Sequence, residues 1–362
     1  MNAGFKDSAA SAAWRAACRR LWPVVVLALS LVAGVPPAHA AKDTLLGVEI
    51  IPANFPNSSV DDITRSLGLA SLIGSHASKI WPWGDVAALP FTGAMVTLSR
   101  QFGLKTLLQM GTIFLGDPAP PEGYVKSFAD PATRAKFLAD VRTLALMKPD
   151  YLVLTTEANL MYRFNKTEFD YYRPLYAEAY QLVKSLSPGT QVGVSYLYSL
   201  WFANFHVDHI DVPALLKPAD FIAFTTYPEW LVREGHFASI AAIPPEWYGA
   251  SRKAYPDAKI IFSEAGWASK VRGTPELQAE YLRNLPRLMS TTRPHLVTWA
   301  VLHDVEFYSR ALLTPESTAF LVGLGVDIDG LFGHFNGMGL LDGFGNPKPG
   351  FYTASQLVFP AP

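Results

Sequence analysis

Tyr151-Leu-Val-Leu-Thr-Thr-Glu157-Ala-Asn159 and Lys259-Ile-Ile-Phe-Ser-Glu264-Ala-Gly-Trp267 are two short apolar runs, and each run ends on a glutamate. Such a run is typical of a strand that is buried on both faces, as in a parallel sheet covered by helices. Packing alone does not explain a glutamate at the end of such a strand. In a parallel barrel, however, the carboxyl ends of the strands form the mouth where chemistry takes place. The two runs therefore predict a barrel with an acid/base and nucleophile pair.

Six further apolar runs have the length of strands, and amphipathic stretches separate them. The eight expected strands are Leu46–Pro52, Ala70–Gly74, Lys105–Met110, Tyr151–Glu157, Gln191–Leu197, Phe221–Thr226, Lys259–Glu264 and Leu296–Leu302. Helices are expected over Pro131–Leu146, over Tyr171–Leu186 and from Thr274 to about Met289. This alternation predicts an α/β fold, a single (β/α)8 TIM barrel. A doubly wound open sheet is the alternative, but no glycine-rich phosphate-binding motif supports it.

The stretch Leu312–Asn346 is long and rich in glycine. Segments of this kind lie on the surface and often carry function. We therefore expect an elaborate loop after the eighth strand, lying over the mouth of the barrel.

Residues 1–40 have the pattern of an export signal. Arg15, Arg19 and Arg20 precede the mostly apolar run Leu21–Val35, and Ala38-His39-Ala40 matches a signal-peptidase site. The apolar run is short for a membrane span. We predict cleavage after Ala40, a secreted or periplasmic protein, and a barrel over residues 41–362. An uncleaved N-terminal anchor is the alternative.

Cysteine use and charge narrow the chemistry. Cys18 is the only cysteine and precedes the cleavage site, so disulfides, zinc-thiolate sites and thiol catalysis are excluded from the expected mature chain. The leader holds four of the 30 basic and one of the 31 acidic residues, which leaves 26 and 30 and a net charge of −4. Neither a nucleic-acid partner nor an anionic membrane fits this charge. We expect a neutral carbohydrate as the partner, and the oligomeric state stays open.

On this strand count, Glu157 ends strand four and Glu264 ends strand seven. These strands lie across the barrel from each other, so their ends can converge on one cleft. Two carboxylates about 5–5.5 Å apart suit a glycosidase that works by double displacement, without a cofactor. One carboxylate attacks the anomeric carbon, and the other protonates the leaving oxygen and then activates water. The alternative is that each glutamate only caps a strand or pairs with an arginine.

These residues resemble those of the clan of retaining (β/α)8 glycoside hydrolases, clan A, which has its acid/base on strand four and its nucleophile on strand seven. Ser263-Glu264-Ala265-Gly266-Trp267 is similar to the nucleophile motif of endo-β-1,3-glucanases and, more loosely, of endo-β-1,4-galactanases. The segment from Gly339 to Phe351 resembles the closing segment before the last helix in several such families. The resemblance implies that Glu264 is the nucleophile and Glu157 the acid/base.

The same resemblance assigns supporting roles. Tyr227 stands where the clan often has a tyrosine bonded to the nucleophile, and Trp299 where many members have a tryptophan beneath the sugar. Members usually have an asparagine directly before the acid/base, whereas this chain has Thr156 there. Asn159 lies close by in sequence, and we expect it to reach the cleft in place of that asparagine.

Several other residues could contact a sugar at the expected strand ends. They are Glu49 at the end of strand one, His76 after strand two, Trp81 and Trp83 in the following loop, Gln109 near the end of strand three, Tyr196 or Tyr198 at the end of strand five, Trp267 beside Glu264, and His303-Asp304 after strand eight. Structural alternatives exist for each group. A buried ion pair would explain Glu49, and loop packing would explain Trp81 and Trp83.

Three functions are compatible with the sequence. The first is an exported retaining glycoside hydrolase that cleaves β-linked poly- or oligosaccharides. The second is a non-catalytic carbohydrate-binding barrel, which Thr156 before Glu157 suggests. The third is a metal-dependent barrel hydrolase that uses the cluster formed by His206, Asp208, His209 and Asp211. We expect no metal, because such spacing is common in solvated loops.

Overall fold

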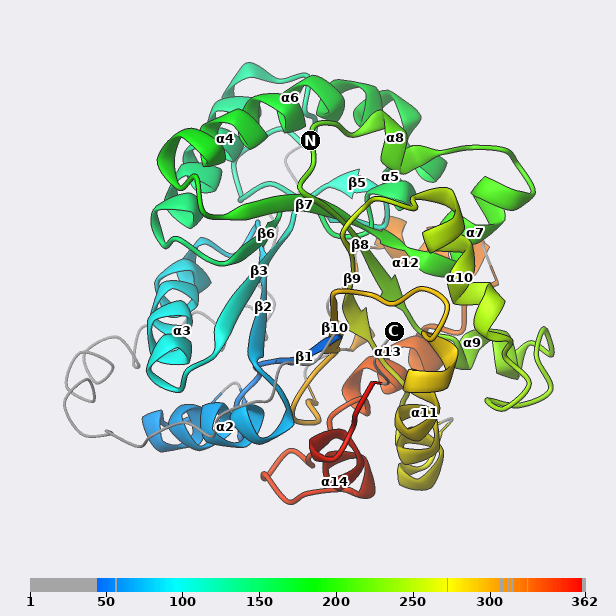
Figure 1. Ribbon diagram of the computed structural model, residues 1–362. Coiled ribbons are helices and arrows are strands. Elements are labelled where there is room, and N and C mark those ends of the chain that lie inside the picture. The colour runs from blue at the N-terminus through cyan, green and yellow to red at the C-terminus, as the bar shows by residue number, and fades with distance from the viewer. Residues whose placement is uncertain are drawn as a thin grey trace.

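The protein folds into a closed barrel of eight parallel strands in the order β1-β10-β9-β8-β7-β6-β3-β2. The computed structural model describes residues 44–55, 57–271, 273–306, 309–310, 313, 315–323 and 325–359. The helices surround the strands (Figure 1). The predicted (β/α)8 fold is therefore confirmed, and the open-sheet alternative is wrong. The expected leader, residues 1–40, lies outside the described residues.

The barrel strands are short, as expected for this fold. They are β1 (Leu45–Glu49), β2 (His76–Pro82), β3 (Lys105–Gly111), β6 (Tyr151–Val153), β7 (Gln191–Leu197), β8 (Phe221–Thr226), β9 (Ile260–Ala265) and β10 (Leu296–Trp299). A separate two-stranded sheet consists of β4 (Ile113–Phe114) and β5 (Asp117–Pro118).

The helices alternate with these strands along the chain. They are α2 (Val60–Ile73), the 3-10 helix η2 (Val86–Ala88), α3 (Leu89–Gln101), α4 (Pro131–Leu146), α5 (Ala158–Phe164), α6 (Lys166–Leu186), α7 (Tyr198–His206), α8 (Val212–Leu215), α9 (Glu229–Arg233), α10 (Pro245–Ala254), α11 (Pro275–Leu288), α12 (Pro315–Gly323), α13 (Ile328–Asn336) and α14 (Pro349–Ser355). Side-chain caps fix several of the starts: Asp130 caps α4 and Thr274 caps α11.

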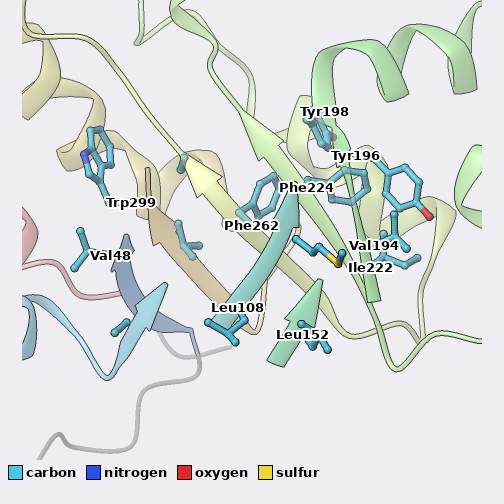
Figure 2. Close-up of a cluster of buried hydrophobic side chains, with 14 of the residues drawn as sticks. Val48, Leu108, Leu152, Val194, Tyr196, Tyr198, Ile222, Phe224, Phe262 and Trp299 are labelled. Carbon is cyan, nitrogen blue, oxygen red and sulfur yellow. The ribbon is translucent and has the colours of Figure 1, made fainter. Parts of the chain in front are cut away.

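Alternate residues of each strand enter two separate cores. One core fills the inside of the barrel, away from its mouth, and contains Leu107, Tyr151, Val153, Phe221, Ala223, Ile261 and Leu296. The other lies between the barrel wall and the helices, and Val48, Phe224 and Trp299 are among its members labelled in Figure 2. Side chains alternate across a strand, so a residue of the second core points away from the barrel axis.

The second predicted strand is wrong. Residues 70–73 form the last turn of α2, which begins earlier with a capping box between Ser59 and Asp62. The actual strand β2 begins at His76 and contains Ser78 and Lys79. His76, Ser78 and Lys79 are polar, so β2 lacks the apolar run by which the other strands were recognised.

The stretch predicted as a long loop, Leu312–Asn346, contains the helices α12 and α13. Phe335 of α13 packs against the cluster of Ala300, Val301 and Met338 at the barrel mouth, whereas Ile328 and Phe332 cluster with Leu321 of α12. Among the described residues no single helix is long and apolar enough to cross a membrane. Ser317–Gly323 and Ile328–Asn336 reach the required length and hydropathy only as a pair, and they are bent by 104°.

Gly193 allows β7 and β8 to pack closely inside the barrel. A β-carbon at this position would lie 2.6 Å from the ring and from the carbonyl oxygen of Phe221. We expect Gly193→Ala to lower the free energy of unfolding by about 1–3 kcal/mol, because the core would be overpacked. Gly189→Ala is the matched control, since a β-carbon there meets no atom within 4 Å. Equal urea midpoints for the two variants would contradict this account of the barrel interior.

Candidate active site

Glu264 points into the barrel mouth because β9 contains a bulge. In the pairing with β8, Phe224 lies opposite Phe262 and Thr225 lies opposite Glu264, so Ser263 is an extra residue. The register with β10 shifts at the same place. Phe262 belongs to the outer core, and regular alternation would also turn Glu264 outward. The bulge reverses this alternation and aims the carboxylate inward.

Two side chains hold the Glu264 carboxylate from different strands. The hydroxyl of Tyr227, directly after β8, donates a hydrogen bond to Oε2. The amide Nε2 of Gln109 on β3 lies 3.4 Å from Oε1. Tyr227 therefore makes the contact that the resemblance implied, and Gln109 reaches the same carboxylate.

Glu157 follows β6 in a left-handed backbone conformation, with φ 53° and ψ 43°. This conformation costs a non-glycine residue roughly 1–2 kcal/mol and is common at functional sites. The hydroxyl of Thr225 donates a 2.6 Å hydrogen bond to Oε1 of Glu157. The backbone N–H of Glu157 donates to Oγ of Ser195 at 3.0 Å. Because Thr225 is also the register partner of Glu264, the two predicted catalytic carboxylates converge on this residue.

Glu49 is a third carboxylate in the same mouth. It ends β1, its Oε1 accepts the backbone N–H of Ile80 at 3.2 Å, and Nζ of Lys79 lies 3.9 Å away. Glu49, Glu264 and Tyr227 line a pocket whose open space, solvent included, is about 370 Å³. The other lining residues are apolar: Ile51, Ile80, Ala300, Val301, Val305, Phe335 and Met338.

Burial raises the pKa of each of these acids. Burial raises the pKa of Glu49 to about 7, although Lys79 partly opposes this. Burial also raises the pKa of Glu264 well above its usual value, and the charges of Glu49 and Glu157 raise it further. The pKa of Glu157 is raised by burial and held back by the hydrogen bond from Thr225.

The two tryptophans expected beneath the sugar lie outside the barrel wall. Trp299 is 3% exposed, belongs to the outer core (Figure 2), and donates from Nε1 to the carbonyl of Met338 at 2.8 Å. Trp267 is also 3% exposed and packs against Tyr281 of α11. Neither ring faces the pocket. The prediction that they form sugar platforms does not fit this placement, because both positions fall on the outward side of their strands.

The other aromatic candidates are buried in the same outer core. Trp81 donates to the carbonyl of Asp85, and Trp83 donates to Asp140 of α4. Tyr196 is an outward residue of β7, and Tyr198 begins α7 and bonds to the backbone of α10. Strand parity places Leu197, rather than either tyrosine, on the inner side.

Asn159 and His76 also have positions that differ from those expected. Asn159 is fully buried, and its amide makes two hydrogen bonds with the backbone of Leu197, at 3.0 and 2.9 Å. It thus fixes α5 to β7 and does not reach the cleft. His76 is the first residue of β2, beside Tyr151 at the opposite end of the barrel from Glu264. The misplaced second strand caused that error.

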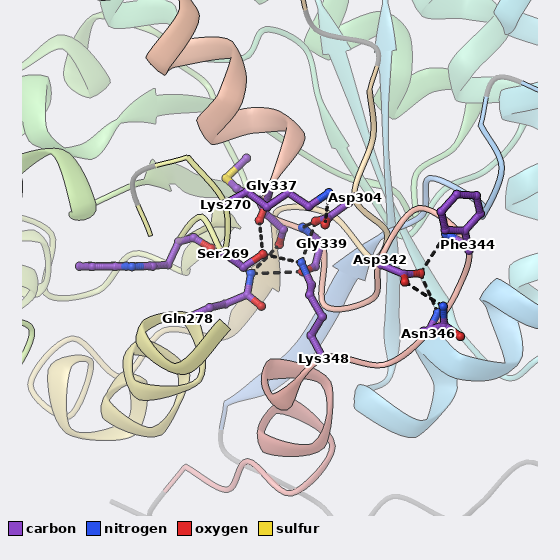
Figure 3. A network of polar contacts seen from close by, with 12 residues as sticks. Ser269, Lys270, Gln278, Asp304, Gly337, Gly339, Asp342, Phe344, Asn346 and Lys348 are labelled. Atoms are coloured by element: carbon purple, nitrogen blue, oxygen red, sulfur yellow. Dashed lines mark hydrogen bonds and ion pairs between the residues drawn. The ribbon is translucent and has the colours of Figure 1, made fainter. Parts of the chain in front are cut away.

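His303 and Asp304 border the segment that covers the mouth and do not line the pocket. His303 contacts the carbonyl of Ile51 at 2.8 Å. Asp304 is buried and forms ion pairs with Lys270 and Lys348, as Figure 3 shows. It also accepts the backbone N–H of Gly339 at 2.9 Å.

The proposed metal cluster does not form among the described residues. Asp211 caps α8 and accepts the hydroxyl of Tyr255. Asp208 lies 3.8 Å from Arg163. These carboxylates therefore serve the local structure of the loop after α7.

Sequence reasoning missed part of the site. Thr225 donates a hydrogen bond to Glu157 and lies opposite Glu264 in the sheet. Phe335 and Met338 cover the pocket from α13 and the turn after it. Thr225 could have been found, because it occupies the inward register of β8 at the mouth. The two covering residues belong to a segment that has no strand or motif to place it.

The comparisons with known proteins agree with this architecture. No family model and no curated protein matches the sequence. A GH5_18 protein from Streptomyces cattleya in complex with GlcNAc is 16% identical, with a TM-score of 0.64 over 88% of this chain and 80% of that chain. A GH5_18 protein from Bifidobacterium longum is 18% identical, with a TM-score of 0.62 over 87% and 78%. A family 39 glycoside hydrolase from Bacteroides cellulosilyticus is 16% identical, with a TM-score of 0.57 over 89% and 65%.

These neighbours are glycoside hydrolases of the clan that the sequence resembles, so the resemblance is confirmed at the level of the fold. At identities of 16–18%, these similarities show that the barrel fold is shared. The reaction of this chain has to be inferred from its own residues.

The raised pKa of Glu49 has a measurable consequence for stability. A group whose pKa is higher in the folded state destabilises the fold once the pH rises through that pKa. The pKa of Glu49 rises from 4.5 to about 7 on folding. As the pH increases from 4 to 8, we therefore expect the free energy of unfolding of Glu49→Gln to increase by about 3 kcal/mol relative to that of the wild type. Urea unfolding at both pH values measures this gain. A difference that is the same at pH 4 and pH 8 would contradict the burial of this carboxylate.

Proposed function

We propose that the protein is an exported retaining glycoside hydrolase, with Glu264 as the nucleophile and Glu157 as the acid/base. The observation that carries this proposal is the convergence of both carboxylates on Thr225, with the Tyr227 hydroxyl bonded to Glu264. The glycoside hydrolases among the structural neighbours support it.

In the first step, the Glu264 carboxylate attacks the anomeric carbon and forms a glycosyl ester. The carboxyl proton of Glu157 moves to the glycosidic oxygen as the bond to the leaving group breaks. In the second step, Glu157 takes a proton from water, and the water oxygen displaces Glu264 from the anomeric carbon. Glu157 is then protonated again, and the product keeps the original anomeric configuration.

The hydrogen bonds favour this division of roles. Glu264 accepts hydrogen bonds from Tyr227 and Gln109, and these donors stabilise a carboxylate more than a carboxylic acid. Glu157 accepts one hydrogen bond, from Thr225, so fewer donors stabilise its carboxylate. Burial raises the pKa of both acids, and the hydrogen bonds are what favour Glu264 as the nucleophile and Glu157 as the acid.

The substrate that fits this pocket is a β-linked poly- or oligosaccharide without negative charge. Among the described residues that line the pocket none is basic, so the lining offers no cation to pair with an anionic sugar. The polar lining consists of acceptors, since the Tyr227 hydroxyl is bonded to Glu264, and sugar hydroxyls can donate to them. The apolar wall suits the hydrophobic face of a sugar ring.

Export follows from residues 1–40 and is part of the proposal. The mature protein would act in the periplasm or outside the cell, without a nucleic-acid partner, a membrane anchor or a cofactor. N-terminal sequencing of the protein from the periplasmic or culture fraction tests this. A first residue at position 41 is the expected result, and an intact Met1 in the membrane fraction would favour the anchor.

We expect Glu264→Gln and Glu157→Gln each to lower the turnover of the true substrate at least 10³-fold, because each removes a group that acts in the transition state. A panel of β-glucans, galactans, mannans and exopolysaccharides is the first screen. Glu246→Gln is the control, since Glu246 is exposed on α10. Full activity of both site variants would refute the proposal.

Azide separates the two roles. In a Glu157→Ala variant, azide can attack the glycosyl enzyme without base assistance, so activity on an aryl glycoside with a good leaving group should recover and yield a β-azide. In Glu264→Ala, azide replaces the nucleophile and should yield an α-azide. Nuclear magnetic resonance of the products distinguishes them, and the opposite assignment would exchange the two roles.

A non-catalytic carbohydrate-binding barrel is the second candidate. Thr156 stands directly before Glu157, and the amide of Asn159 is occupied by Leu197, so neither position offers the free side-chain amide expected to contact a sugar 2-hydroxyl. Binding of an oligosaccharide with unchanged affinity in Glu264→Gln, and no turnover by the wild type, would favour this function.

A further inference from the structure

We propose that Glu229 and His334 form a positioning pair that fastens α13 over the pocket and thereby holds Tyr227 against Glu264. The two residues are 105 positions apart in the sequence, and Nδ1 of His334 lies 3.1 Å from Oε2 of Glu229. The kinetic part of this inference rests on the proposed function. The structural part does not.

Glu229 lies at the junction of two segments that shape the site. It begins α9, two residues after Tyr227, and is 3% exposed. Its Oε2 also accepts the backbone N–H of Ala268 at 2.7 Å. Ala268 belongs to the segment that follows Glu264. One carboxylate therefore ties together the ends of β8 and β9 and the helix α13.

His334 connects α13, the helix that covers the pocket, to this junction. It is fully buried on α13, and its ring packs edge-on against Tyr227, with centroids 5.6 Å apart. The next residue, Phe335, also packs against the Tyr227 ring, with centroids 5.8 Å apart, and it lines the pocket. Tyr227 is thus held between the barrel and two rings of α13, and its hydroxyl is directed at Glu264.

Burying this polar pair costs folding free energy. Oε1 of Glu229 and Nε2 of His334 are buried and have no hydrogen-bond partner among the described residues. An apolar pair would close the same space without leaving two polar atoms unpaired. What the polar pair adds is a directional bond, which fixes the position of α13 more narrowly than apolar packing does.

The neighbouring turn is fastened independently. Met338, which lines the pocket, receives hydrogen bonds at its carbonyl from Trp299 at 2.8 Å and Gln278 at 3.2 Å. The carbonyl of Gly337 accepts from Ser269, as Figure 3 shows. We therefore expect the turn at Gly337 and Met338 to stay in place when the bond between Glu229 and His334 is broken. A substitution of either residue then tests the position of α13 alone.

Two substitutions at His334 separate the hydrogen bond from the ring. His334→Phe keeps a flat ring beside Tyr227 and loses the donor to Glu229. His334→Asn keeps an N–H near the position of Nδ1 and loses the ring. Glu168→Gln is the matched control, because Glu168 is also a buried carboxylate that accepts a backbone N–H, from Phe128 at 2.6 Å, and it lies away from the pocket.

Hydrogen exchange measures the fastening without requiring activity. In His334→Phe we expect exchange at least tenfold faster in peptides that cover residues 328–336 and 266–269, with the other peptides unchanged. His334→Asn should restore most of the protection. Uniformly faster exchange over the whole barrel, or no change in these two peptides, would overturn the proposal. Glu168→Gln should leave both peptides as they are in the wild type.

Kinetics test the positioning of Tyr227. In His334→Phe the hydrogen bond from Tyr227 would weaken, which raises the pKa of Glu264 and moves the acidic limb of the kcat/KM profile to higher pH. We expect kcat/KM to fall about tenfold, with most of the loss in kcat. An unshifted limb, together with local loosening of α13, would overturn the link to Tyr227. If no β-glycoside is cleaved by the wild type, the proposed function fails, and the exchange result still decides the fastening.

Discussion

Like-charge repulsion between three buried carboxylates is the constraint on which the rest of the mouth depends. Glu49, Glu157 and Glu264 come from different strands, and burial alone would neutralise all of them. Each is therefore given a different partner: a lysine and a backbone N–H for Glu49, Thr225 for Glu157, Tyr227 and Gln109 for Glu264. The fold acts on the chemistry through these partners, since the difference between them is what can separate one protonation state from another.

Much of the fold could be predicted from the sequence, because most strands carry an apolar run and several helices carry a cap. The second strand could not, since the polar residues His76, Ser78 and Lys79 interrupt the apolar run. The convergence of the glutamates followed from counting strands. The side on which each tryptophan lies did not follow, because an aromatic residue fits either core, and only the register decides between them.

The abundance of aromatic residues has a structural explanation in this protein. Aromatic side chains make up 13% of the sequence, which suggested sugar stacking. The described tryptophans that were candidates for stacking lie between the barrel and its helices instead, where they donate hydrogen bonds to backbone or acidic groups or pack against other rings. Wide rings fill the wedge-shaped space between a curved sheet and straight helices. The pocket is lined mainly by small aliphatic side chains and by one phenylalanine.

The extra residue in β9 makes the identity of the inward side chain a matter of counting. Without the bulge at Ser263, regular alternation from Phe262 in the outer core would turn Glu264 toward the helices, although no residue of the motif had changed its type. A chain with this fold can therefore keep every residue of the motif around its glutamate and still have the carboxylate point away from the barrel mouth. For such barrels, the length of the strand before the motif carries as much information as the motif itself.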